Sequence, residues 1–508
     1  MQAAISAHIE PLLIRHAEDA AFYWAQLDGA ARAFNLYPER HAHFNRLLDA
    51  HLEGLLVAEE HGVAPALKAL ERWGQPGEAF VAAWLGLQWR HRDPAAIEAL
   101  LGRVSAAPES LMRGLISAVA WLPAAARPEA LAYLAQRGEI GQVAALRAAA
   151  LIGATPGGFD PFPGLAPLLD DPGAQPSPWV RAAACRALAA MAIRAWGDAL
   201  PHEQATGPLS ELVAAWESKW VDGLQPTVDH SPPALLRRLL EDSEAPVRAE
   251  AALGLARLYA RAPAHANLLD ARRILREVLP PQLAELQRSS GATRQWVLRR
   301  LLRWLACLAW LTPPGSPDAA AILRELPPRL ALTFLLHHGD LAQLPRIVAW
   351  MQDPLLARHA GWVWQTLTGI DLEAHGLVIE SDEAVVETIA DDVAAGDPAA
   401  GAPAAGAPGD PFALQDAQRD ADNGLPQPDV ARIVAYPVPN VANTERHLLG
   451  RPASREWLRN VVDGDHPHAV RAVAAHGLML LAPVAATRVK GPVFADTHAA
   501  PQPVSEHR

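Results

Sequence analysis

The sequence feature that most constrains the fold is a helical phrase that recurs along the chain. From Trp179 to Met191 it reads WVRAAACRALAAM, a Val-Arg pair followed by small and apolar residues at helical spacing. This phrase is typical of the second helix of a HEAT-like repeat, where one helical hairpin cannot bury both of its faces and neighbours must stack. The pattern therefore predicts an all-α fold, a HEAT-like α-solenoid of helical hairpins.

The spacing of the recurring arginine favours a regular array. Arg113, Arg147 and Arg181 are 34 residues apart, and Arg248 follows Arg181 at close to twice that interval. The positions three and seven residues after each arginine are apolar, so they share one helix face. We predict that each arginine pairs with an aspartate of an adjacent turn, such as Asp170–Asp171, and that each exposed pair contributes about 0–1 kcal/mol.

Changes in periodicity and composition predict five segments. An atypical helical start precedes the repeats, because a solenoid must cover its first apolar face. An aperiodic stretch rich in Ala, Gly and Pro interrupts them later, and the repeat phrase returns once after it. The predicted segments are a helical N-terminal cap (1–63), the HEAT-like α-solenoid (64–370), an acidic disordered linker (371–424), a C-terminal helical module with a final repeat (425–486) and a flexible tail (487–508).

The negative charge of the chain is concentrated in the predicted linker. Between Asp371 and Asp422 there are 13 acidic residues and one arginine, which accounts for the net charge of −12. The remainder carries 43 basic and 43 acidic residues. Since non-specific nucleic-acid binding needs a net basic face, we expect no nucleic-acid partner.

Cysteine usage and hydropathy predict a cytoplasmic protein without a membrane partner. Cys185 and Cys307 lie in apolar helical patterns, and a disulfide framework would need more cysteines. The N-terminus lacks a basic signal region, and Glu10 and Arg15 interrupt any apolar run. The most apolar helix, near 297–311, carries three arginines, so we expect no membrane span.

Five short strings along the chain carry a resemblance. They are Leu52–Leu55, Trp73–Phe80, Leu367–Leu372, Gly424–Asp429 and His447–Pro452. Together they resemble an uncharacterised family of bacterial HEAT-repeat proteins that are often encoded near type VI secretion genes. The resemblance implies a genomic context and no catalytic residues.

The chain departs from that family pattern at two places. Gln427 stands where the family is expected to have a tryptophan, and Tyr436-Pro437 stands where it is expected to have two. Docking of this segment through aromatic side chains would be weaker as a result. With the genomic context, the fold predicts a non-enzymatic scaffold or adaptor that binds another protein, accessory to type VI secretion through an effector or component.

Histidine pairs are the main candidates for metal binding or catalysis. Zinc needs three or four ligands in a defined geometry, and no pair has a nearby Cys or a helical i, i+4 partner. The stretch Gly153–Gly158 lacks the Gly-Lys-Ser/Thr ending of a phosphate-binding loop, and no Gly-x-Ser-x-Gly elbow occurs. We therefore predict no catalytic, cofactor-binding or metal site. The histidine pairs are His41 and His43, His337 and His338, and His466 and His468.

Two other classes of function stay open at this point. An enzyme of the phycobilisome-lyase-like HEAT-repeat type, or a metal-dependent enzyme with cryptic His ligands, would share the same repeat pattern. A deep pocket lined by His and carboxylates would favour it. Self-assembly through an uncapped end of the repeats is the other alternative.

Tryptophan and arginine supply the candidates for protein binding. The chain has 16 Trp against 5 Tyr, and exposed Trp and Arg on a concave helical surface are typical binding anchors. Trp296 and Arg300 are spaced for a cation–π contact of about 0.5–1 kcal/mol. The predicted protein-binding residues are Trp89, Arg90, Trp216, Trp220, Arg272, Arg276, Trp296, Arg299, Arg300 and Arg303.

The basic stretch near 272–303 and the acidic linker suggest a competition within the chain. We predict that the linker screens the basic surface in cis; two unrelated solvated features are the alternative. Deleting Asp382–Asp420 and measuring partner binding against salt separates them. Unchanged affinity and salt slope would rule out the competition.

Overall fold

The computed structural model is all-α in the residues that it describes. These are 9–152, 176–199, 232–260, 262, 264–379, 422, 424–438 and 445–481. Within them, the β structure is one isolated bridge, Val378 to Pro428, and a short ladder between β1 (His447–Leu448) and β2 (Arg451–Pro452). The predicted all-α class is confirmed.

Several predicted features lie outside the described residues, so they stay predictions. They are the Gly153–Gly158 stretch, the Asp170–Asp171 turn, the candidates Trp216 and Trp220, most of the acidic linker, and the 487–508 tail.

Contacts divide the chain into two units. The first is Met1–Thr312 with Ser454–Arg508, and the second is Pro313–Ala453. The division falls inside both the segment predicted as one solenoid and the predicted C-terminal module. Local periodicity does not mark this boundary, because helices on both sides of Thr312 carry similar apolar stripes.

The first unit begins with packed helices. α1 (Glu10–Gly29) and α2 (Pro38–Val57) pack together and are joined through η1 (Ala30–Arg32). η2 (Glu59–Gly62) and α3 (Val63–Trp73) follow, and α3 packs on α1. Leucines and alanines spaced three and four residues apart form the buried stripe of each long helix.

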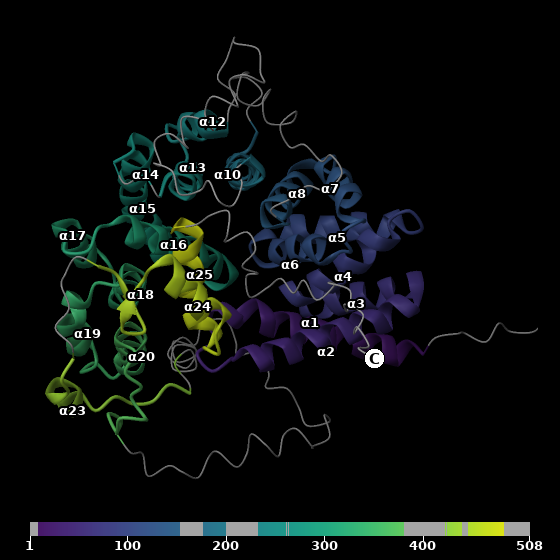
Figure 1. Ribbon diagram of the computed structural model, residues 1–508. Coiled ribbons are helices and arrows are strands. Elements are labelled where there is room, and N and C mark those ends of the chain that lie inside the picture. Colours follow the sequence, from purple (N-terminus) through teal and green to yellow (C-terminus); the bar gives the residue numbers. More distant parts are fainter. Residues whose placement is uncertain are drawn as a thin grey trace, which may run out of the picture. The chain divides into compact units, whose positions relative to one another are not determined.

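Helices then pack one after another from the cap onward. α4, α6, α8, α10 and α13 each contact the next (Figure 1). The first four begin at 76, 108, 138 and 178, and their average interval equals that between the repeat arginines. Their bounds, with the shorter helices between them, are α4 (Pro76–Trp89), α5 (Pro94–Ala106), α6 (Pro108–Trp121), α7 (Arg127–Ala135), α8 (Gly138–Ile152), α10 (Pro178–Ala199), α12 (Pro232–Leu239) and α13 (Ala245–Tyr259).

Glycines allow two of these helix pairs to approach closely. A Cβ on Gly77 of α4 would lie 2.5 Å from the carbonyl oxygen of Ala21 in α1. A Cβ on Gly114 of α6 would collide with the carbonyl oxygen of Pro76 and lie 2.7 Å from the amide nitrogen of Phe80, both in α4. Because these obstacles are backbone atoms, the contacts need glycine at both positions.

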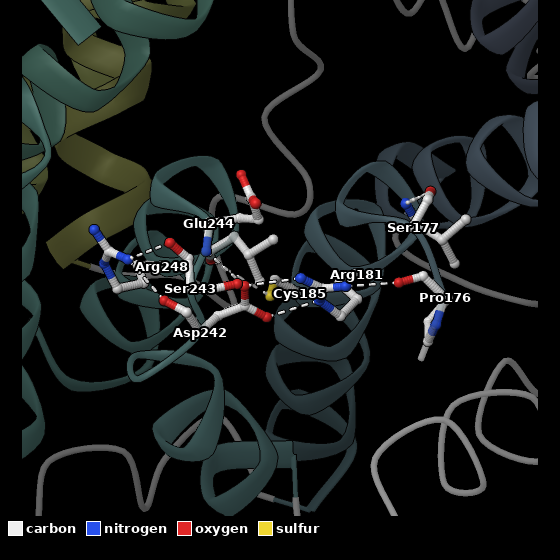
Figure 2. Close-up of polar contacts among 10 residues, drawn as sticks. Pro176, Ser177, Arg181, Cys185, Asp242, Ser243, Glu244 and Arg248 are labelled. Carbon is white, nitrogen blue, oxygen red and sulfur yellow. Dashed lines mark hydrogen bonds and ion pairs between the residues drawn. The ribbon is translucent and has the colours of Figure 1, made fainter. Parts of the chain in front are cut away.

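One repeat arginine makes the predicted kind of contact, as Figure 2 shows. Arg181 at the start of α10 donates from Nε and Nη2 to the carboxylate of Asp242, at 2.7 and 2.9 Å. Arg248 donates to the backbone carbonyls of Asp242 and Ser243, at 2.7 and 2.9 Å. An arginine and an aspartate of a neighbouring turn therefore fix α10 against α13.

The C-terminal helices return to the first unit. α14 (Ala266–Glu277) and α15 (Leu279–Arg288) lead into α16 (Gly291–Leu311), which contacts α6, α13 and α25. α25 (His468–Leu481) packs on α16 and on α24 (Arg455–Asp463), and both C-terminal helices are yellow in Figure 1.

α25 joins the two ends of this row of helices. The amide of His468 donates to the carbonyl of Leu36, just after η1, at 2.8 Å. At Gly477, a Cβ would lie 2.5 Å from the ring of Trp310 at the end of α16. A circuit of helix contacts therefore runs from α1 through α16 and α25 back to η1.

The second unit gathers three of the five strings that carry the family resemblance. Its helices are α17 (Pro317–Glu325), α18 (Pro328–His338), η3 (Leu341–Gln343), α19 (Leu344–Trp350), α20 (Ala357–Thr368) and α23 (Val430–Ala435). The amides of Leu449 and Gly450 donate to the carbonyls of Thr366 and Leu367, at 2.7 and 3.0 Å. The Pro428 ring lies against Gly361, and all three strings therefore pack around α20.

We expect the first unit to lose stability in acid because of His468, which lies where α25 meets the N-terminal helices. His468 is 5% exposed, its ring centroid lies 4.0 Å from that of His41, and Arg471 is adjacent. Burial, then the charges of His41 and Arg471, lower the pKa of His468 to about 3. The unfolded chain binds this proton near pH 6.5, so the stabilisation is complete above about pH 6.5 and falls by about 1.4 kcal/mol per pH unit below it.

The measurement is the thermal midpoint as a function of pH for the wild type and two variants. His468→Gln should flatten the decline between neutral and mildly acid pH. His91→Gln, which changes an exposed histidine of the first unit, should retain the wild-type slope. Equal slopes in wild type and His468→Gln would contradict the assignment.

Candidate functional site

Helices α6, α8, α10, α13 and α16 and the turn at η1, all in the first unit, surround an arginine-lined hollow. Two adjoining pockets of about 350 and 320 Å³ share Arg113, Arg147, Arg186, Arg303 and Glu250 in their walls. We call this hollow the arginine cavity. Its charged residues are Asp28, Arg32, Glu109, Arg113, Arg147, Arg186, Glu250, Arg257, Arg299, Arg300 and Arg303.

Helical spacing explains how α16 reaches this cavity. Trp296, Arg299, Arg300 and Arg303 follow the i, i+3, i+4, i+7 pattern and share one face. All four line the larger pocket. The four residues were predicted as protein-binding candidates from sequence, and the structure brings them together.

Glu250 of α13 is the buried anion of the cavity. It is 3% exposed, and it accepts from Nε and Nη2 of Arg186 at 2.9 and 3.0 Å and from Nη2 of Arg303. The indole N–H of Trp304 donates to it at 3.3 Å. Burial raises the pKa of Glu250, but the arginines outweigh this effect and lower it to about 2, so the carboxylate is ionised at neutral pH.

Two further arginines of the cavity are neutralised locally. Arg113 donates from Nε to Asp28 of α1, and Arg300 donates to Glu285 at 2.7 Å. The Arg300 guanidinium lies 4.6 Å from the ring centroid of Trp296. The predicted Trp296–Arg300 cation–π contact is confirmed.

Four arginines of the cavity have no carboxylate within ion-pair distance among the described residues. They are Arg32, Arg147, Arg257 and Arg299. Burial lowers the pKa of all four, that of Arg257 to about 10. The guanidinium stays protonated at neutral pH, so the cavity carries positive charge that its own acids do not balance.

The sequence pointed to some arginines of this cavity for a different reason. Arg113 and Arg147 were predicted as repeat arginines that pair with turn aspartates, together with Arg181. In the structure Arg181 binds Asp242 outside the cavity, while Arg186 of the same helix lines it. Sequence reasoning missed Glu250. A usable signal was that Glu250 is the one acidic residue of α13 and stands among apolar residues of a buried helix.

The remaining predicted binding residues lie elsewhere on the first unit. Arg90 is buried, and it donates to Glu129 and to the carbonyl of Leu87, each at 2.5 Å. Trp89 is half-buried beneath the guanidinium of Arg92. Arg272 and Arg276 are half-buried on α14 and do not line the cavity.

Metal-ligand groups and thiols are the other candidates for chemistry among the described residues. In this part of the chain, no three His, Cys, Asp or Glu side chains group as metal ligands would. Cys307 lies in the cavity wall, and burial raises the pKa of its thiol to about 12. The thiol is therefore protonated at neutral pH, and the thiolate is the nucleophilic form.

Three comparisons of this chain with known proteins gave no match. No protein-family model matches the sequence, no curated protein matches it, and no solved structure matches the fold. No helix in the described ranges combines the length and the apolar character needed to cross a membrane.

Proposed function

We propose that this protein is a non-enzymatic scaffold or adaptor that binds an acidic segment of another protein in the arginine cavity. The observation that supports it is the charge imbalance there: eight arginines face three acids, Asp28, Glu109 and Glu250. Arginine binds carboxylates through paired N–H donors. An acidic segment would supply the counter-charge that the described walls lack.

The proposal includes the fold type and the cellular setting. Helices packed in succession, at the same average interval as the repeat arginines, suit a HEAT-like α-solenoid. The family resemblance favours a cytoplasmic role accessory to type VI secretion, with an effector or component as the partner. A largely preformed concave surface keeps the ordering cost of binding low.

The direct test is the binding of a fluorescent acidic peptide, followed by anisotropy as salt increases. We expect affinity to fall with salt, because ion pairs at a partly open site are screened. The double variant Arg32→Glu/Arg299→Glu reverses two arginines of the cavity that have no carboxylate partner among described residues. It should weaken binding by about tenfold or more, given about 1.5–3 kcal/mol for each charged hydrogen bond.

A matched control tests for a general charge effect. Arg103→Glu changes an arginine of α5 whose side chain is 42% exposed and pairs with Glu71. It should leave the affinity within about twofold of wild type. Equal losses in both variants, or tighter binding of an oligonucleotide of equal charge, would contradict an acidic protein segment as the ligand.

A further inference from the structure

Arg147 is one of the residues that line both pockets of the arginine cavity. It projects from α8 into both pockets. The charges that act on it are those of Arg186, Arg303, Glu250 and Arg113. Among the described residues it pairs with no carboxylate, whereas its arginine neighbours share Glu250 and Asp28.

The local charge around Arg147 matches a dianion. Four arginines, at 113, 147, 186 and 303, surround two carboxylates, Asp28 and Glu250. Two positive charges are therefore left over at neutral pH. A phosphate monoester carries about −1.5 to −2 at this pH, whereas one carboxylate supplies only a single charge.

The arrangement of donors also favours a tetrahedral oxyanion. Arg113, Arg147 and Arg186 come from α6, α8 and α10, three helices that pack in succession. Arg186 uses Nε and Nη2 for Glu250, so among the described residues Nη1 is left for another acceptor. Donors that approach from separate helices suit three phosphate oxygens better than the two coplanar oxygens of a carboxylate.

The wall beside these arginines is aromatic and apolar. The ring centroids of Trp179 and Trp296 lie 5.6 Å apart, and Met112 and Val143 line the same pocket. A pocket of about 350 Å³ is within the size range of small-ligand sites. Room and apolar surface are therefore available for the organic part of a phosphate ester.

We infer that the arginine cavity binds a phosphate monoester group between Arg113, Arg147 and Arg186, with the organic part of the ligand against Trp179 and Trp296. This inference rests on the proposed function for its choice of cavity, and it names the anionic group that enters there. The group can come from a phosphorylated side chain of a protein partner or from a small organic phosphate.

The test is calorimetric titration of the full chain with inorganic phosphate and, at equal ionic strength, with acetate. Phosphate should bind at least about tenfold more tightly than acetate, because of its extra charge and donor-matched oxygens. Arg147→Gln should weaken phosphate binding by about tenfold, and the surface control Arg103→Gln should not change it. Equal affinity for both anions, or equal binding by wild type and Arg147→Gln, would overturn the inference.

A thermal melt shows whether Arg147→Gln folds. Because the change removes a half-buried positive charge among like charges, the ligand-free variant should melt no lower than wild type. Phosphate should raise the midpoint of wild type and leave that of Arg147→Gln unchanged. A phosphate-induced rise of the same size in both proteins would count against the site.

Peptide titrations identify the source of the phosphate and separate this inference from the proposed function. A serine-phosphorylated peptide that binds about tenfold more tightly than free phosphate supports a protein source, and equal affinities support a small organic phosphate. If an acidic unphosphorylated peptide binds and phosphate does not, the inference fails and the proposed function stands. If phosphate binds and neither peptide does, the inference stands and the proposed function fails.

Discussion

Replacing Glu250 by glutamine is expected to lower the free energy of unfolding of the first unit by about 3–5 kcal/mol. Glu250 is 3% exposed and neutralises both Arg186 and Arg303. Its amide isostere keeps the volume but removes the charge, so two guanidiniums stay in the cavity wall without a counter-ion. Thermal unfolding followed by far-UV circular dichroism measures the effect as a lower midpoint.

Two comparisons isolate the charge as the cause of this loss. Glu277→Gln removes an exposed acid that pairs with Arg273 at 2.8 Å, and it should cost no more than about 1 kcal/mol. Adding Arg303→Gln to Glu250→Gln should restore part of the stability, because it removes one unpaired charge. If Glu250→Gln melted like Glu277→Gln, Glu250 would not be the anion that stabilises the cavity.

Gly114→Ala is expected to destabilise the first unit, because overpacking of a well-packed contact costs about 1–3 kcal/mol and occasionally more. A Cβ at this position meets the carbonyl oxygen of Pro76 and the amide nitrogen of Phe80 in α4. Backbone atoms cannot rotate away as side chains do, so α6 and α4 must separate. The loss should exceed the roughly 1 kcal/mol that alanine gains over glycine in a helix.

Gly102→Ala provides a control of opposite sign. Gly102 lies inside α5, and a Cβ there would meet no atom within 4 Å. Alanine should therefore stabilise the protein by about 0.5–1 kcal/mol through helix propensity alone. Thermal midpoints that shift in the same direction for both variants would refute the close approach of α6 and α4.

Sequence reasoning predicted the face of α16 that lines the cavity, but it did not predict the residues that this face meets. The spacing of Trp296, Arg299, Arg300 and Arg303 places them on one helical face, because the 3.6-residue period is local. The partners of that face could not be predicted in the same way. Glu250 meets Arg186 across 64 residues and Arg303 across 53, and no local pattern specifies such a pairing.

The two repeat arginines Arg147 and Arg181 show the same limit. They are 34 residues apart, yet Arg147 is the tenth residue of α8 and Arg181 the fourth of α10. Their helices begin at Gly138 and Pro178, which lie farther apart in the sequence than the two arginines do. One therefore faces the cavity and the other binds Asp242, because the position within a helix decides the face that a side chain occupies.

The sequence by itself determined that the chain forms short helices with apolar stripes, since helix propensity, proline starts and 3.6-residue periodicity are properties of neighbouring residues. Only the tertiary structure decided which polar faces meet. α16 crosses to contact α6, and α25 returns to the turn after α1. These long-range contacts bring eight arginines around a buried glutamate, because helix packing brings together charges that are far apart along the chain.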